Sequence, residues 1–116
     1  MAMKEIEANS VAREKSALLS RIKGAVHSVL PDAQVILYGS QARGDARPDS
    51  DYDLLILADQ PPTLVLEDAI REQLYPIELE TGGVLTVMTY STADWSSAPY
   101  RGMPFHEAVE REGIVL

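Results

Sequence analysis

The feature that most constrains the fold is the alternation of three short apolar runs with segments of helical periodicity. The runs are rich in Val, Ile and Leu, are bounded by Gly, Pro or Asp, and span residues 33–38, 54–57 and 84–90. Runs of this length are typical of buried strands and are too short for core helices. The chain is therefore predicted to be an α/β (α+β) protein, with a small mixed sheet of three or more strands flanked by helices.

The segments around these strands carry the spacing of amphipathic helices. Apolar residues recur at intervals of three, four or seven in a stripe that predicts a first helix over about residues 5–29. Thr63 is a candidate N-cap for a second long helix, which Pro76 is expected to kink or restart and which Gly82 is expected to end. A short final helix is predicted over residues 104–112.

Length and composition set the broad class. A chain of 116 residues is expected to form a single domain over residues 1–116. The absence of cysteine excludes disulfides, thiolate zinc sites and cysteine nucleophiles. No apolar run approaches the ~18 residues that span a bilayer, and the first residues lack the apolar core of a signal peptide. We therefore expect a cytoplasmic protein that does not enter a membrane.

The charge is unevenly distributed along the chain. The net formal charge is −8, and residues 1–48 carry seven basic and five acidic side chains, whereas residues 49–116 carry three basic and thirteen acidic ones. A protein that follows a nucleic-acid backbone normally presents a broad basic surface. Direct nucleic-acid binding is therefore not expected. A small ligand whose phosphates are neutralised by a metal and a few arginines remains compatible with this balance.

The first candidate site motif is Tyr-Gly-Ser-Gln-Ala-Arg-Gly, which follows the first predicted strand. Gly39 permits a sharp turn and a close approach of a ligand to the backbone, and Ser40 adds a hydroxyl beside the amides that open the next helical turn. Arg43, one helical turn after Ser40, can bind a phosphate with two parallel hydrogen bonds. On this motif alone, a tight strand-to-helix turn that carries a capping serine is the better interpretation.

The second motif is Ser-Asp-Tyr-Asp at the start of the second predicted strand. At strand spacing Asp51 and Asp53 project from the same face, where two carboxylates repel each other unless a cation lies between them. Oxygen ligands suit Mg²⁺, which typically takes one or two carboxylates together with phosphate oxygens and water. A solvated acidic turn is the alternative interpretation of this motif alone.

Taken together, Gly-Ser-x-Ala-Arg-Gly followed by Ser-Asp-x-Asp-Leu closely resembles the signature of the nucleotidyltransferase superfamily typified by DNA polymerase beta. The short chain is similar to the minimal nucleotidyltransferase branch of that superfamily. The resemblance implies that Gly39 and Ser40 contact the β- and γ-phosphates of a nucleoside triphosphate and that Arg43 helps to neutralise them. A salt bridge from Arg43 to Asp45 or Asp49 is the alternative role for the arginine. The resemblance also implies that Asp51 and Asp53 hold Mg²⁺ during transfer of a nucleoside monophosphate, with release of pyrophosphate.

The sequence departs from the family pattern at one position. The resemblance implies a third carboxylate on the following strand, but residues 84–90 contain no acid, and Thr86 occupies roughly the expected place. Glu78, Glu80 and Asp94 are the nearest acidic residues, and each would need an unusual path to reach the metals. Loss of the third carboxylate should impair catalysis more than nucleotide binding.

Two functional hypotheses follow from the resemblance. The first is a Mg²⁺-dependent transferase that binds a nucleoside triphosphate, in particular ATP, and moves AMP to a helical partner protein of the HEPN type, for which it acts as antitoxin. The second is a catalytically silent module of the same fold that neutralises its partner by complex formation. The missing acid on residues 84–90 motivates the second hypothesis.

Overall fold

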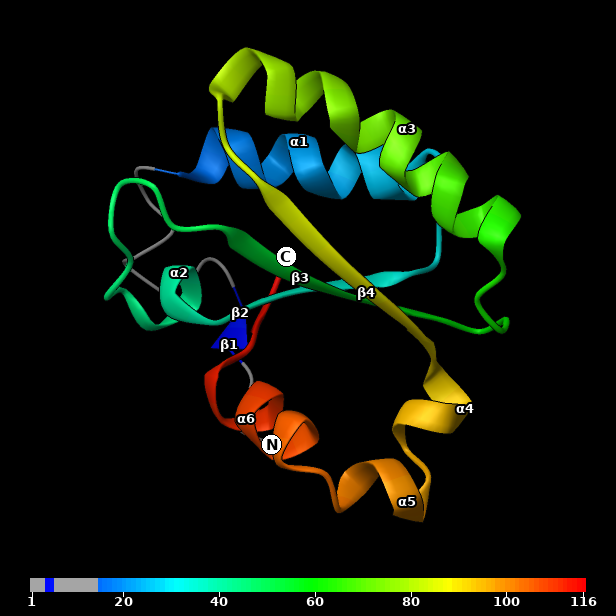
Figure 1. Ribbon diagram of the computed structural model, residues 1–116. Coiled ribbons are helices and arrows are strands. Elements are labelled where there is room, and N and C mark those ends of the chain that lie inside the picture. The colour runs from blue at the N-terminus through cyan, green and yellow to red at the C-terminus, as the bar shows by residue number, and fades with distance from the viewer. Residues whose placement is uncertain (1–3, 6–14) are drawn as a thin grey trace.

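The computed structural model describes residues 4–5 and 15–116 and contains one mixed sheet with helices on both faces (Figure 1). The strands are β1 (Lys4–Glu5), β2 (Gln34–Tyr38), β3 (Tyr52–Ala58), β4 (Leu85–Ser91) and β5 (Ile114–Val115). The helices are α1 (Ser16–His27), α2 (Ser40–Arg43), α3 (Leu64–Thr81), α4 (Thr92–Trp95), α5 (Ala98–Arg101) and α6 (Pro104–Glu112).

The sheet has the strand order β1-β5-β2-β3-β4. β2 pairs antiparallel with both β3 and β5, whereas the β3–β4 and β1–β5 pairs are parallel. A parallel pair needs a crossover, and α3 supplies it between β3 and β4. β3 is thus flanked by a strand on each side and covered on each face, which explains why every residue from Leu54 to Ala58 is buried.

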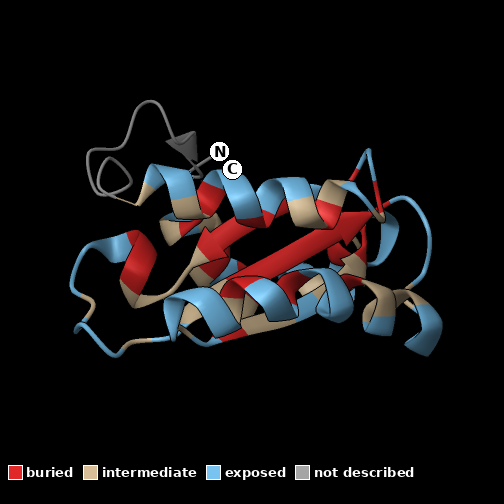
Figure 2. Ribbon diagram, turned by 90° about the horizontal axis from the view of Figure 1, so that it is seen from above, coloured by how far each residue is buried: buried red, intermediate tan, exposed pale blue. Residues whose placement is uncertain are grey.

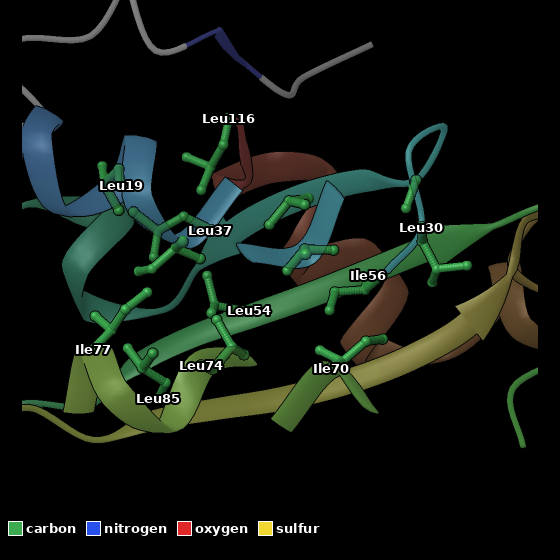
Figure 3. Packing of buried hydrophobic residues seen from close by; sticks show 14 of the residues in the cluster. Leu19, Leu30, Leu37, Leu54, Ile56, Ile70, Leu74, Ile77, Leu85 and Leu116 are labelled. Atoms are coloured by element: carbon green, nitrogen blue, oxygen red, sulfur yellow. The ribbon is translucent and has the colours of Figure 1, made fainter. Parts of the chain in front are cut away.

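α1 and α3 cover one face of the sheet and run in opposite directions (Figure 1). Their outer surfaces are exposed, whereas the residues that meet the sheet are buried (Figure 2). An ion pair of 2.8 Å between Arg21 and Glu80 joins the two helices at their exposed side. The core between them and the sheet includes Leu19, Ile22, Val26, Leu37, Leu54, Ile56, Ile70, Leu74, Ile77 and Leu85 (Figure 3).

The opposite face is covered only in part, by the short helices α4, α5 and α6 (Figure 1). A second, smaller core forms there from Ile36, Leu55, Leu57, Trp95 and Val109. α4 packs at the end of β3 that lies toward Ala58, whereas Phe105 of α6 packs against Tyr38, which lies opposite Asp53 in the ladder. The predicted site residues lie at this second end of the face, where β3 begins.

The structure confirms the predicted fold class, a mixed sheet flanked by helices. The three predicted strands correspond to β2, β3 and β4, and the predicted final helix has the bounds of α6. The Thr63 hydroxyl accepts a hydrogen bond of 3.1 Å from the Leu66 amide and caps α3, and Gly82 ends that helix in a left-handed conformation with φ of +72°.

Two helix predictions need correction. The first helix was expected to begin near Glu5, but Lys4 and Glu5 form β1 and α1 begins at Ser16; residues 6–14 lie outside the described residues. A two-residue strand is too short to leave a period in the sequence. Of the two expectations for Pro76, a kink or a restart, the restart is wrong, because α3 continues through the proline to Thr81. Ile70, Leu74 and Ile77, buried on both sides of the proline, hold the helix against the sheet despite the lost hydrogen bond.

Several of the observed elements were not predicted from the sequence. β5, α4 and α5 are each four residues or fewer, and their stability comes from packing rather than from local periodicity. Within residues 4–5 and 15–116, no helix combines the length and the apolar character that a membrane crossing requires.

Candidate functional site

The turn between β2 and α2 is built around Gly39. Its φ of +76° lies in the region that residues with a Cβ avoid, so the chain can turn here only with glycine. The Gly39 carbonyl accepts hydrogen bonds of 3.0 Å from the amides of Ala42 and Arg43, which closes the single turn of α2. Ser40 therefore stands directly after the end of β2, at the first position of α2.

The same glycine lies against the acid of the neighbouring strand. Tyr38 and Asp53 are opposite each other in the β2–β3 ladder, so the residue after Tyr38 passes beside the Asp53 side chain. A Cβ placed on Gly39 would lie 2.3 Å from Oδ2 of Asp53, a distance that no real carbon–oxygen contact shows. The turn and the acid pair, which are separate motifs in the sequence, therefore form one surface.

The acid pair stands at the entrance to β3. Asp53 lies opposite Thr86 in the parallel β3–β4 ladder, and Oγ1 of Thr86 donates a hydrogen bond of 3.4 Å to Oδ2 of Asp51. Asp51 is exposed and Asp53 is half-buried. The oxygen-bearing side chains of Asp51, directly before β3, of Asp53 in β3 and of Thr86 in β4 thus meet beside the Gly39 turn.

Electrostatics at this point disfavour a second negative charge. Partial burial raises the pKa of Asp53, the neighbouring Asp51 raises it further, and Arg43 opposes the shift. Burial also raises the pKa of the Tyr38 hydroxyl, and the nearby charge of Asp53 raises it further. A cation beside the two carboxylates would relieve this repulsion.

The Arg43 side chain points toward two acids outside the pair, Asp45 and Glu112. Its Nε donates to Oδ2 of Asp45 at 3.2 Å, and its Nη1 donates to Oε1 of Glu112 at 3.1 Å. Both hydrogen bonds raise the pKa of the guanidinium, and the one to Asp45 has the larger effect. The sequence alone left a salt bridge to Asp45 or Asp49 open as an alternative to phosphate binding, and the structure adds Glu112, which sequence spacing did not suggest.

A residue that the sequence analysis did not single out, Gln41, is buried beneath this surface with 3 % of its area exposed. Its Nε2 donates to the carbonyl oxygen of Ser50 at 3.2 Å, and its Oε1 accepts a hydrogen bond from Nζ of Lys15. The Ser50 hydroxyl in turn accepts a hydrogen bond of 2.8 Å from the Arg47 amide. The only sequence signal was an amide side chain at an inward-facing position of a very short helix.

The three acids considered as substitutes for the missing carboxylate have other positions and partners. Oε2 of Glu78 accepts a hydrogen bond of 2.9 Å from the Leu85 amide, and Glu80 pairs with Arg21. Asp94 lies in α4, beyond the end of β4 that is remote from Thr86. Over the part of the chain that the structure describes, no group of three or more His, Cys, Asp or Glu side chains could hold a metal ion.

The donor set at the acid pair nevertheless suits one hard divalent cation. Two carboxylates and a neutral hydroxyl from Thr86 offer oxygen atoms only, and like-charge repulsion between the carboxylates favours a bound cation. Such ions commonly use one or two protein carboxylates and complete their coordination with phosphate oxygens and water. The pair therefore fits a cation that arrives together with a phosphate-bearing ligand.

The fold and this arrangement agree with what comparison with known proteins shows. Residues 19–92 match the family described as "Nucleotidyltransferase domain", and the matched region runs from α1 to the end of β4 and contains the turn and the acid pair. The chain belongs to the nucleotidyltransferase domain family. Domains of this family are generally dependent on divalent metals.

Two curated relatives carry more specific names. The chain is 33% identical over 58 residues to a Haemophilus influenzae protein named "Probable protein adenylyltransferase MntA", in a match that covers 50% of this chain and 51% of the relative. It is 43% identical over 49 residues to a Methanocaldococcus jannaschii protein that is also named as a protein adenylyltransferase, covering 40% of this chain and 50% of the relative. The chain thus spans about half the length of the curated relatives it matches.

The contact between Gly39 and Asp53 predicts a large effect of a single added methyl group. Gly39→Ala should lower the free energy of unfolding by about 2–4 kcal/mol, because the new side chain adopts an unfavourable φ and displaces the Asp53 carboxylate. Chemical denaturation measures this loss. Gly24→Ala is the matched control: Gly24 lies in α1 with open space around it, so the change should raise stability by about 0.5–1 kcal/mol. Equal effects at both positions would contradict the close contact.

The raised pKa of Asp53 predicts a pH-dependent effect of its removal. The folded state holds the Asp53 proton more tightly than the unfolded state, so ionisation costs stability, and the cost is complete only above the folded pKa. Metal-free Asp53→Asn should therefore be more stable than the parent at neutral pH, and the difference should shrink toward about pH 3. Thermal unfolding across this range tests it, with Asp59→Asn correcting for general loss of one negative charge. A difference that grows on acidification would contradict the shift.

Proposed function

We propose that this protein binds a nucleoside triphosphate, in particular ATP, together with Mg²⁺, and transfers AMP from it to a hydroxyl group of a partner protein. The observation that carries the proposal is the contact between the Gly39 turn and the Asp53 carboxylate, which joins a phosphate-binding type of turn to a cation-binding type of acid pair. Membership of the nucleotidyltransferase domain family and the names of the two relatives support it.

In this proposal Gly39 and Ser40 contact the β- and γ-phosphates. Gly39 leaves no side chain between the backbone and a ligand, and the Ser40 hydroxyl can donate to a phosphate oxygen. Arg43 lies close enough to influence Asp53 and carries a positive charge. It would exchange its contacts with the exposed Asp45 and with Glu112 for a phosphate oxygen, since exposed ion pairs of this kind contribute little to stability.

Asp51 and Asp53 would hold Mg²⁺ through their carboxylate oxygens. Bound there, Mg²⁺ would supply positive charge to the triphosphate at the point where negative charge develops. The half-buried Asp53 is fixed by its place in the ladder and by Gly39, whereas Asp51 is exposed and accepts a hydrogen bond from Thr86. The two acids therefore orient the α-phosphate relative to the turn that holds the β- and γ-phosphates.

The transfer step consists of one bond made and one bond broken at phosphorus. The acceptor hydroxyl oxygen bonds to the α-phosphorus, the bond from the α-phosphorus to the bridging oxygen of the β-phosphate breaks, and pyrophosphate leaves. The hydroxyl proton is released to the solvent, to which Asp51 is exposed. What the chain contributes is orientation of the reacting atoms, which is itself a large part of the rate enhancement in such reactions.

The proposed acceptor is a separate helical protein of the HEPN type, for which this protein would be the antitoxin. The residues that the structure describes form one sheet and the helices that cover it. Both curated relatives are named for action on proteins. Modification of a toxin side chain by AMP would then inactivate the toxin.

A second candidate function is a catalytically silent module that binds the nucleotide and neutralises its partner by forming a complex. The observation that favours it is Thr86: a hydroxyl lies opposite Asp53, where the superfamily resemblance implies a third carboxylate. Glu78 and Glu80 have partners elsewhere, and neither fills that place. Such a module would keep metal-dependent nucleotide binding without transfer.

Nucleotide binding is predicted to depend on Mg²⁺ through the acid pair. Asp51→Asn combined with Asp53→Asn should abolish the Mg²⁺-dependent part of ATP binding, while metal-free stability stays unchanged or rises slightly because the repulsion is removed. Ser40→Ala, the milder comparison, should weaken binding by about 1.5–3 kcal/mol at saturating Mg²⁺. Calorimetric titration with ATP, with and without Mg²⁺, measures both. Parent binding that ignores Mg²⁺ would refute the role of the pair.

Transfer is predicted to move label only from the α-phosphate. ATP labelled at either the α- or the γ-phosphate is incubated with Mg²⁺, the protein and any HEPN-type protein encoded beside its gene. The transferase proposal expects α-label on the partner and no γ-label. The silent module expects a stable complex without label, and absence of both label and complex would refute the antitoxin role.

A Thr86→Asp variant extends the labelling experiment by restoring a carboxylate at this position. The new carboxylate opposite Asp53 should lower the Mg²⁺ concentration needed for ATP binding, reduce metal-free stability and increase the rate of labelling. Thr86→Asn, of similar size but neutral, should do none of these. If Thr86→Asp leaves the Mg²⁺ requirement unchanged, position 86 does not face the metal.

A further inference from the structure

We propose that Gln41 is a positioning residue for Asp51: its buried amide holds the Ser50 carbonyl and so fixes the distance between the phosphate-binding turn and the first metal-binding acid. This inference rests on the proposed function and deepens it, because it assigns a role to a side chain that contacts neither phosphate nor metal. It depends on three contacts: Gln41 with Ser50, Gln41 with Lys15, and Lys15 with the ring of Tyr52.

The first argument is the burial of a polar group. Gln41 is 3 % exposed, although it lies in a helix of four residues whose last member, Arg43, is exposed. Burial of an amide is unfavourable unless both its donor and its acceptor are satisfied, and an apolar side chain of similar size would avoid the cost. Both ends of the Gln41 amide are bonded, one to Ser50 and one to Lys15. The site therefore uses the amide for its hydrogen bonds.

The second argument is the place where the amide donates. Ser50 directly precedes Asp51, and Nε2 of Gln41 holds the Ser50 carbonyl oxygen at 3.2 Å. On the other side of Asp51, the Tyr52 amide donates to the Val84 carbonyl at 2.9 Å and begins the strand. Asp51 thus lies between two anchors, and Gln41 supplies one of them.

Asp53 does not need this support. It lies inside β3, paired with Tyr38 on one side and Thr86 on the other, and packs against Gly39. Loss of the Gln41 amide should therefore displace Asp51 while leaving Asp53 in place. This asymmetry separates positioning from a general effect on the fold.

Lys15 determines which way the amide faces. Its ammonium donates to Oε1 of Gln41 and lies 5.6 Å from the centre of the Tyr52 ring. An ammonium group can only donate, so the oxygen of the amide must face Lys15 and the NH₂ group must face Ser50. Lys15 orients Gln41, but the contact with the loop is made by Gln41 alone.

Three substitutions separate these contributions. Gln41→Glu keeps the size and the contact with Lys15, now as an ion pair, but places a carboxylate oxygen against the Ser50 carbonyl. Gln41→Met keeps the volume and loses both hydrogen bonds. Lys15→Met keeps the donor to Ser50 and removes only the orienting cation.

The experiment measures the Mg²⁺ concentration that gives half-maximal ATP binding by calorimetry, together with the unfolding midpoint of each variant. Gln41→Glu and Gln41→Met should raise that concentration about tenfold, because each loses a buried hydrogen bond that positions Asp51. Lys15→Met should change it by less than about threefold. ATP affinity at saturating Mg²⁺ should fall much less than the Mg²⁺ requirement rises, since the turn itself is intact.

Amide hydrogen exchange without metal or nucleotide tests the inference independently of the proposed function. Exchange at Tyr52 should become about tenfold faster in Gln41→Glu, whereas exchange at Leu55, deep in the ladder, should not change. A parent that shows no Mg²⁺-dependent ATP binding would overturn the proposed function and with it the link between Gln41 and metal binding. Faster exchange at Tyr52 would then still support the positioning of Asp51, and unchanged exchange would overturn it.

A purely structural role gives a different result. If Gln41→Glu, Gln41→Met and Lys15→Met shift the Mg²⁺ requirement only in proportion to their loss of stability, Gln41 merely holds α2 in place and the inference is wrong. If Gln41→Glu keeps the parent's unfolding midpoint and still loses the Mg²⁺ response, positioning is supported.

Discussion

The approach of the Gly39 backbone to the Asp53 carboxylate is the constraint on which the rest of the site depends. β2 and β3 are antiparallel neighbours, so the end of one strand meets the start of the other, and Tyr38 lies opposite Asp53. Only a residue without a side chain and with φ of +76° can then turn away into α2. The β2–β3 pairing thereby places a turn rich in backbone amides, an exposed acid and a half-buried acid on one surface.

The sequence predicted the two strands that carry the motifs, because apolar runs identify strands, and it placed the motifs at the end of one strand and the start of the next. It did not predict β1 or β5, whose two residues each are fixed by pairing and leave no period. Gln41 was missed for a related reason: in a polar stretch nothing marks one amide as buried. The partner Glu112 of Arg43 was missed because it is 69 residues away and only the tertiary fold brings it near.

Thr86 shows how one position can separate binding from chemistry. Its hydroxyl approaches Asp51 without adding negative charge, so the metal-free site contains two carboxylates and less repulsion than three would create. Two acids are enough for a cation that brings its own phosphate ligands. Activation of an attacking hydroxyl is the step for which the third carboxylate is missing. Membership of the nucleotidyltransferase domain family therefore determines the fold of this protein more firmly than its catalytic activity.

The ion pair between Arg43 and Glu112 also has a consequence for the order in which the molecule assembles. Contacts that close long loops form late, because the entropy of the intervening chain must be lost first. During synthesis Arg43 meets Asp45, two residues away, long before Glu112 emerges and α6 docks on the sheet. A nascent chain therefore carries its arginine less restrained than the finished fold does, and docking of α6 is the event that sets the final resting position of that side chain.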